Sequence, residues 1–192
     1  MLMNRVMGAL TFKRQVYADV EKDTSFTGTA WGIVVVLALL TQLATYAASE
    51  DITSWLIASV IGTVIAVIAF AVGAFVITWL GKALFKADAT FDEMVRTLGL
   101  AYVWNVVAAL GALSFFVPAL GCVIGPATCI ASILGLVSYF IATQEALDLD
   151  TGKTLITVIA GWVVTFLIVF SATFIVGILG FGVSAIGGAL TQ

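Results

Sequence analysis

The stretch "ITSWLIASVIGTVIAVIAFAVGAFVITWLG", residues 52–81, contains no charged side chain. A helix of about 20 apolar residues is long enough to cross the hydrocarbon core of a bilayer. This stretch therefore predicts a membrane-spanning helix, and the same criterion applies to the rest of the chain.

Three more charge-free runs cover residues 24–49, 97–144 and 154–192. The first can hold one span, the second can hold two if it turns in the middle, and the third can hold one span and a short apolar tail. Only 10% of the 192 residues are charged, against about 25% in soluble domains. The predicted fold class is all-α, a polytopic transmembrane helical bundle. Its five spans are expected at about 28–48, 54–80, 97–117, 126–144 and 154–178.

The basic residues predict the orientation of this bundle. With five spans, all eight Lys and Arg fall on one side of the membrane, whereas four or six spans would divide them. The positive-inside rule makes that side cytoplasmic, so the N-terminus is expected inside and the C-terminus outside. These residues are Arg5, Lys13, Arg14, Lys22, Lys82, Lys86, Arg96 and Lys153.

Residues 1–23 are expected to form a cytoplasmic segment before a membrane domain of residues 24–192. The charges in this segment leave no apolar core for a cleavable signal peptide, so the first span is expected to direct insertion. Residues 4–22 predict one amphipathic helix lying in the membrane interface, with Lys13 and Arg14 reaching toward the headgroups. Its apolar face consists of Val6, Leu10, Tyr17 and Val20.

Both prolines and both cysteines lie within "FVPALGCVIGPATC", residues 116–129. Pro118 is expected to end the third helix, and Pro126 to lie in the first turn of the fourth, with residues 117–125 as an outer turn. On an unbroken helix Cys122 and Cys129 would be about 10.5 Å apart, too far for a disulfide. A break at Pro126 leaves two alternatives, a disulfide on the oxidising face or, preferably, two free thiols packed as small hydrophobic groups. Two thiolates alone do not complete a zinc site, so no metal is predicted.

The chain has no histidine, and no span contains a charge. This argues against Ser–His hydrolysis, His-ligated metal catalysis and His-ligated haem. A net charge of −3 gives no electrostatic support for nucleic-acid binding. We therefore predict no enzymatic activity, no catalytic residue and no cofactor. Asn105 is the most costly polar residue at membrane depth, and it predicts either a helix–helix contact or the wall of a functional cavity.

Two stripes repeat every four residues. The fourth span carries small residues that favour close helix approach, namely Ala127, Ala131 and Gly135. The fifth span carries an aromatic ridge, namely Trp162, Phe166, Phe170 and Phe174. The ridge suits lipid contact or internal packing, or else a docking surface for another membrane protein or a flat lipophilic cofactor.

Three segments carry a family resemblance: "GALTFKRQVYADVEKDTSFTGTAW" (residues 8–31), "ATFDEMVRTLGLAYVWNVV" (89–107) and "QEALDLDTGKTLITVIAGW" (144–162). The second contains the S/T-x-x-E capping box of Thr90 and Glu93, which is expected to start the third helix. Together the segments resemble the Yip-domain (Ypt/Rab-interacting protein) family, in its prokaryotic branch of five-span membrane proteins. Family members often have a proline where this chain reads "VWNVV", which implies a straighter third helix here.

The resemblance implies a bundle with the N-terminus inside and the C-terminus outside. Eukaryotic members act through Rab GTPases and have a long cytoplasmic N-terminal region that this sequence lacks, so GTPase binding is not expected. We predict a non-enzymatic membrane scaffold or adaptor in a prokaryotic plasma membrane, such as an accessory subunit of a respiratory or photosynthetic complex. Its expected partners are the lipid bilayer and other integral membrane proteins. The alternative is a small transporter or channel with a polar cavity near Asn105.

The predicted orientation can be tested by cysteine accessibility. In a variant with Cys122 and Cys129 replaced by Ser, Glu50→Cys should react with an impermeant thiol reagent in intact cells. Asp88→Cys should react only in inverted membrane vesicles. Labelling of position 50 from the cytoplasmic side alone would contradict the orientation.

Overall fold

The computed structural model describes residues 2–46, 51–113 and 117–190, and its regular structure in these ranges is helical. Within these ranges it describes the backbone but no side chains for residues 112, 118, 169 and 172–190. The expected ends of the first and third spans, at residues 47–48 and 114–116, lie outside the described residues.

The N-terminal segment forms two helices, α1 (Leu2–Leu10) and α2 (Arg14–Lys22), so the prediction of one helix over residues 4–22 is wrong. Phe12, between them, has a φ of 57°, in the left-handed region. The Lys13 N–H donates to the Gly8 carbonyl at 2.9 Å and the Phe12 N–H to Ala9 at 3.2 Å, which is the Schellman pattern that ends a helix. A left-handed non-glycine residue costs about 1–2 kcal/mol. Stacking of Phe12 on Trp104, with centroids 5.5 Å apart, offsets part of this cost.

Four helical segments are long and apolar enough to cross a membrane in the described part of the chain. They are Thr24–Thr45, Ile52–Phe85, Gly121–Leu147 and Thr151–Ile168. The first comprises a 3₁₀ turn, η1 (Thr24–Phe26), and α3 (Thr27–Thr45). The next two are α4 (Ile52–Phe85) and α8 (Gly121–Leu147). The last is the start of α9, which continues to Leu190.

The segment expected as the third span is helical but irregular. It runs through α5 (Phe91–Ala101), η2 (Tyr102–Asn105), α6 (Val106–Ala109) and η3 (Leu110–Ala112), where η denotes 3₁₀ geometry. Its start is the predicted capping box, which the structure confirms. At "VWNVV" the chain takes 3₁₀ geometry, because η2 begins just before this sequence; the straighter third helix that the resemblance implies stays a prediction. The Asn105 side chain donates to the Tyr102 carbonyl three residues earlier, a local bond that favours the tighter turn.

The fourth predicted span begins earlier than expected. After η4 (Pro118–Leu120), α8 starts at Gly121. Pro126 therefore lies inside α8 and does not interrupt the helix between the two cysteines. A proline near a helix N-terminus removes one hydrogen bond, here to the Cys122 carbonyl. Such a loss is tolerated in membrane helices when neighbouring groups satisfy the freed carbonyl.

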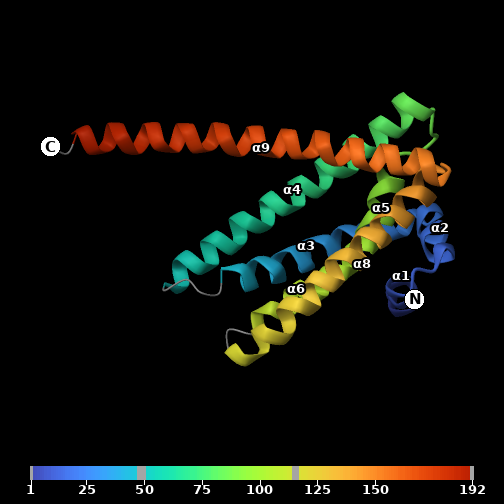
Figure 1. Cartoon of the computed structure of the whole chain (residues 1–192), viewed down its shortest axis with the longest axis horizontal. Helices are drawn as coiled ribbons and strands as arrows, with labels where there is room; N and C mark the ends of the chain where they lie inside the picture. The colour runs from blue at the N-terminus through green and yellow to red at the C-terminus, as the bar shows by residue number, and fades with distance from the viewer. Residues whose placement is uncertain (1, 47–50, 114–116, 191–192) are drawn as a thin grey trace.

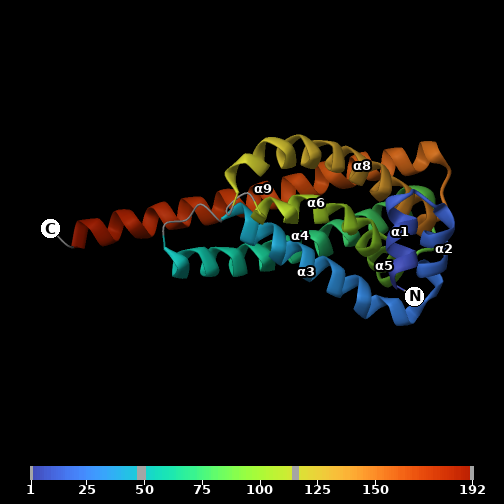
Figure 2. The ribbon, with the colours of Figure 1, turned by 90° about the horizontal axis from the view of Figure 1, so that it is seen from below.

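Figures 1 and 2 show that α3, α4, the path from α5 to η3, α8 and α9 run in alternating directions along the molecule. The helices α1 and α2, the α4–α5 connection and the α8–α9 turn gather at one end. We call it the basic end, because α1, α2 and these two connections carry or adjoin the Lys and Arg residues of the chain. At the other end, α9 extends past the remaining helices (Figure 1).

A buried arginine joins the N-terminal helices to the bundle. Arg96 in α5 is only 4% exposed. Its Nε donates to the Val20 and Glu21 carbonyls at 3.1 and 3.0 Å, and its Nη2 also donates to the Glu21 carbonyl. Its Nη1 donates to the Thr27 hydroxyl at 3.2 Å. These carbonyls belong to the last turn of α2, the end at which a helix favours a cation.

Contacts with α8 reinforce this junction. The Arg14 Nη2 donates to the Gln144 amide oxygen at 2.7 Å, and Arg14 also pairs with Glu145 at 3.3 Å. The Tyr17 and Ser138 hydroxyls are 2.5 Å apart and buried. The buried side chains of α1 and α2 belong to the same hydrophobic core as those of α5 and α8.

Glycines let the spans approach closely at the basic end. A Cβ at Gly99 in α5 would lie 2.8 Å from the Ala30 Cβ and 3.1 Å from the Ala30 carbonyl oxygen in α3. A Cβ at Gly161 in α9 would lie 2.5 Å from the Ile77 Cγ1 in α4, and one at Gly81 in α4 would lie 2.8 Å from Leu147 in α8. These positions hold α3, α4, α5, α8 and α9 against one another near the basic end.

Replacement of Arg96 by Gln should loosen the N-terminal helices. Because the Val20 and Glu21 carbonyls would lose their buried donors, we expect a loss of about 2 kcal/mol. Limited proteolysis and hydrogen exchange should show faster cleavage and exchange over residues 2–22, with little change in α4 or α8. The control is Lys82→Gln, an exposed basic residue near the same end. Equal behaviour of the two variants would contradict the assigned role of Arg96.

Candidate functional site

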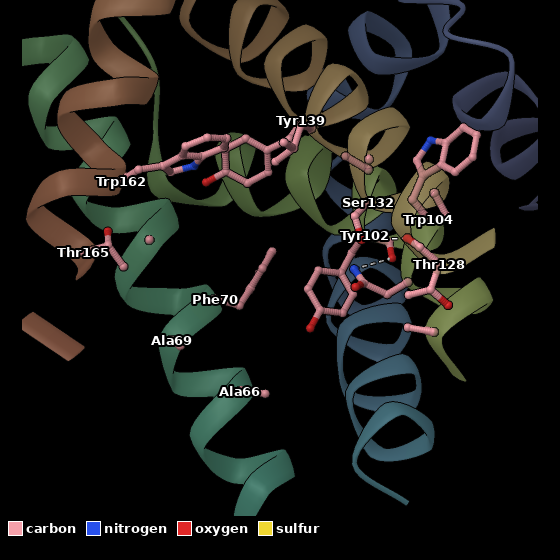
Figure 3. Close-up of a pocket in the computed structure, with 17 residues that line it drawn as sticks. Ala66, Ala69, Phe70, Tyr102, Trp104, Thr128, Ser132, Tyr139, Trp162 and Thr165 are labelled. Atoms are coloured by element: carbon pink, nitrogen blue, oxygen red, sulfur yellow. Dashed lines mark hydrogen bonds between the residues drawn. The ribbon is translucent and has the colours of Figure 1, made fainter. Parts of the chain in front are cut away.

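A cavity of about 550 Å³ lies between α4, the α5–α6 path, α8 and α9 (Figure 3). Ala66, Ala69 and Gly73 line it on α4, and Ala131 and Gly135 line it on α8. Because these side chains are small, the helices leave open space where larger residues would fill it. The volume lies within the range of about 300–1,000 Å³ that is typical of small-molecule sites.

Aromatic side chains form the ordered part of the cavity wall. Phe70 on α4 makes an edge-to-face contact with Tyr102 at 5.7 Å, and with Trp31 on α3 at 5.6 Å. Tyr139 on α8 and Trp162 on α9 are 6.0 Å apart, and Figure 3 shows them together at one end of the cavity. Such contacts hold the rings in defined positions, so the wall is preorganised.

Two polar side chains in the wall bond within their own helical segments, and two others have no partner in the described part of the chain. The Asn105 amide donates to the Tyr102 carbonyl at 3.1 Å, and the Ser132 hydroxyl to the Thr128 carbonyl at 2.8 Å. The Thr165 hydroxyl oxygen and the Trp104 indole nitrogen are buried without a hydrogen-bond partner among the described residues. Among the residues that the structure describes, no Asp, Glu, Lys or Arg lines the cavity. The wall that these residues form is therefore mostly apolar and uncharged.

The structure divides the predicted aromatic ridge of α9. Trp162 lines the cavity and packs near Tyr139. Phe166 and Phe170 are 66% and 57% exposed, and their rings stack with centroids 5.8 Å apart. The side chain of Phe174 lies outside the described part. The described ridge thus has one residue at the cavity and two on the outer surface of α9.

The small-residue stripe of α8 lies against the third helical path. Ala131 is buried, Ala127 is partly buried, and a Cβ at Gly135 would lie 3.2 Å from the Trp104 Cβ. This closeness lets η2 pack on α8, and it positions Asn105 and Tyr102 in the cavity wall.

Cys122 and Cys129 are free and exposed on one continuous helix. Seven residues of α-helix separate their backbones by about 10.5 Å along the axis, beyond the reach of a disulfide. Being exposed, the thiols are not packed in the interior either, and on a membrane helix they face the lipid.

The acidic residues of the basic end do not form a metal site. In the described part of the chain, no group of three or more His, Cys, Asp or Glu side chains could hold a metal ion. Burial, followed by the charges of Asp148, Glu93 and Glu145, raises the pKa of Glu21 above its ordinary value. A carboxyl group whose pKa is raised in the folded state destabilises the fold as it ionises. The contribution of Glu21 to the free energy of unfolding is therefore more favourable in slightly acidic solution than at higher pH.

Several cavity residues were not predicted from sequence. Phe70 lies in the charge-free run 52–81, and Tyr102 and Tyr139 both lie in the run 97–144, where all three resemble ordinary apolar positions. The two tyrosines do carry a signal, since a phenol at membrane depth requires a polar contact or an interior position. That signal does not say which helices face one another.

These features define a multi-pass membrane protein with a cavity among its spans. A family model described as the Yip1 domain matches residues 7–189, so the chain belongs to the Yip1 domain family. This is not an enzyme family. No curated protein and no solved structure matches the chain.

Replacement of Gly135 by Leu should separate α8 from η2. The added side chain meets Trp104, and overpacking of this kind costs about 1–3 kcal/mol. Gly125→Leu is the matched control on the same helix, since a Cβ there has nothing within 4 Å. In detergent, the melting temperature should fall for Gly135→Leu and stay near the wild-type value for Gly125→Leu. Equal melting temperatures would show that α8 and η2 are not in contact.

Proposed function

We propose that the chain is a non-enzymatic scaffold or adaptor with five spans in a prokaryotic plasma membrane. Four of the proposed spans are the long apolar helical segments. The additional one is the irregular path from α5 to η3, which comes third in the chain. Two observations support it: this path runs antiparallel to α4 and α8, which precede and follow it in the chain, and the basic residues lie in or beside segments that gather at one end (Figure 1). The positive-inside rule then favours a cytoplasmic N-terminus and an outer C-terminus.

In this proposal α1 lies in the cytoplasmic interface of the membrane. Leu2, Met3 and Met7 are exposed on α1 and border an apolar groove beside α3. Arg5, on the same helix, pairs with Asp23 at 2.7 Å and lies over the Phe26 ring. An apolar face next to a membrane span, with a charged face above it, suits a helix at the headgroup boundary.

The observation that carries the scaffold function is the exposed, stacked pair Phe166 and Phe170 on α9. Lipid tails are as apolar as Leu, so large rings gain nothing special from contact with lipid. Rings gain about 0.5–1.5 kcal/mol per pair by contact with other packed rings. The pair therefore suits a docking surface for another integral membrane protein, as expected of an accessory subunit of a larger membrane complex.

The second candidate is a small transporter or channel, and the cavity beside Asn105 favours it. Transport of a charged or strongly polar substrate needs hydrogen-bonding groups that are free to bind it. The Asn105 amide already donates to Tyr102, and charged residues are absent from the lining. The scaffold therefore remains the better-supported function.

The double variant Phe166→Leu, Phe170→Leu tests the docking surface. It keeps α9 apolar enough to insert but removes the stacked rings, so co-purification of the integral membrane partner in mild detergent should fall at least about fivefold. The control is Phe75→Leu, a similarly exposed ring on α4. A photoreactive phenylalanine analogue at position 166, but not at position 75, should give one discrete cross-linked species. Unchanged recovery of the partner by the double variant would rule out this surface.

A further inference from the structure

We propose that the cavity between α4, α8 and α9 is a binding site for one acyl chain of a bilayer glycerophospholipid. The site rests on membrane insertion of these helices and is independent of the scaffold function. Ala66 and Ala69 lie near the middle of α4, and Ser132 and Gly135 near the middle of α8. At that depth the surrounding solvent is hydrocarbon.

The cavity arises because the helices diverge. Near the basic end they touch, as Gly81 meets Leu147 and Gly161 meets Ile77. Farther along, α8 and α9 spread apart, as Figures 1 and 2 show. Leu136 and Trp162 both line the cavity and are 49% and 40% exposed, so they lie at its mouth. A chain can therefore enter sideways from the bilayer between α8 and α9.

The chemistry of the wall selects the occupant. A charged ligand would have to be desolvated without a counter-charge, because charged side chains are absent from the lining. Asn105 and Ser132 bond to their own helices, and the two unpartnered polar atoms, the Thr165 hydroxyl and the Trp104 indole nitrogen, belong to residues on opposite sides of the cavity (Figure 3), so a water beside either one has few partners. A hydrocarbon chain needs no hydrogen bonds and gains dispersion contacts with the small residues and the rings.

The need to fill the space supports the same occupant. Side chains that line an empty cavity lose the contacts that a close-packed interior would provide. Ala66, Ala69 and Gly73 place three small residues along one wall of α4. Their neighbours Ile65 and Ile68 are large and exposed, so the small residues coincide with the cavity and not with the whole helix. The lipid chain, in our proposal, replaces the side chains that this wall lacks.

Ala69→Phe tests the site by filling it from within the protein. Ile68→Phe is the matched control, because Ile68 is on the same helix and is 56% exposed. Each protein is stripped of lipid by detergent exchange and then supplied with palmitoyl-oleoyl phosphatidylglycerol. Wild type and Ile68→Phe should melt about 5 °C higher with this lipid than without it, whereas Ala69→Phe should gain little. Ala69→Phe should also melt above stripped wild type, since its own ring fills the cavity.

Native mass spectrometry gives an independent readout. Wild type and Ile68→Phe should retain one adduct with the mass of the phospholipid, and Ala69→Phe should retain at least tenfold less. Ala66→Phe, on the same wall, provides a second filling variant if Ala69→Phe fails to fold. Retention of a free fatty acid in place of the phospholipid would overturn the proposed source. Equal phospholipid retention by wild type and the filling variants, or an equal melting response to lipid, would overturn the site.

Discussion

The burial of the Arg96 guanidinium fixes how the rest of the chain is arranged. A buried cation requires partners, and here they are the last carbonyls of α2 and a hydroxyl at the start of α3. These carbonyls and this hydroxyl belong to the N-terminal part of the chain, so α5 can bury its arginine only when α2 and α3 pack against it. Arg14 and Tyr17 then connect α2 to α8. One end of the bundle is therefore fixed by polar contacts.

Beyond this polar end, the distance between neighbouring helices depends on the size of the side chains that lie between them. Gly81, Gly99 and Gly161 permit close contact near the basic end. Farther from the basic end, the small residues of α4 and α8 do not touch each other and instead line the cavity. Since lipid provides no hydrophobic force between helices, only specific packing could close this gap. The cavity is thus a consequence of a bundle held at one end.

Composition and charge predicted the class of fold, because long charge-free runs have few alternatives to membrane helices. The capping box predicted the start of α5 correctly, since its bonds are local. Local rules failed at two places: Phe12 adopts a left-handed conformation and stacks on Trp104, and α8 continues through Pro126. Asn105 was one expected cavity wall and does line the cavity, but the rest of the lining could not be predicted, because Phe70, Tyr102 and Tyr139 come from three segments that must first pack together. Arg96 looked like an ordinary loop charge until its burial was known.

Trp162 connects the two surfaces of α9. Its ring lies at the mouth of the cavity, and the exposed rings of Phe166 and Phe170 follow one and two turns farther along the helix. An acyl chain against Trp162 would restrict this part of α9, and a partner docked on Phe166 would do the same from outside. Each would then reduce the ordering cost of the other, and such a coupling is reciprocal. If both proposals hold, the scaffold would bind its partner most tightly with lipid in the cavity, and the bilayer would take part in assembly.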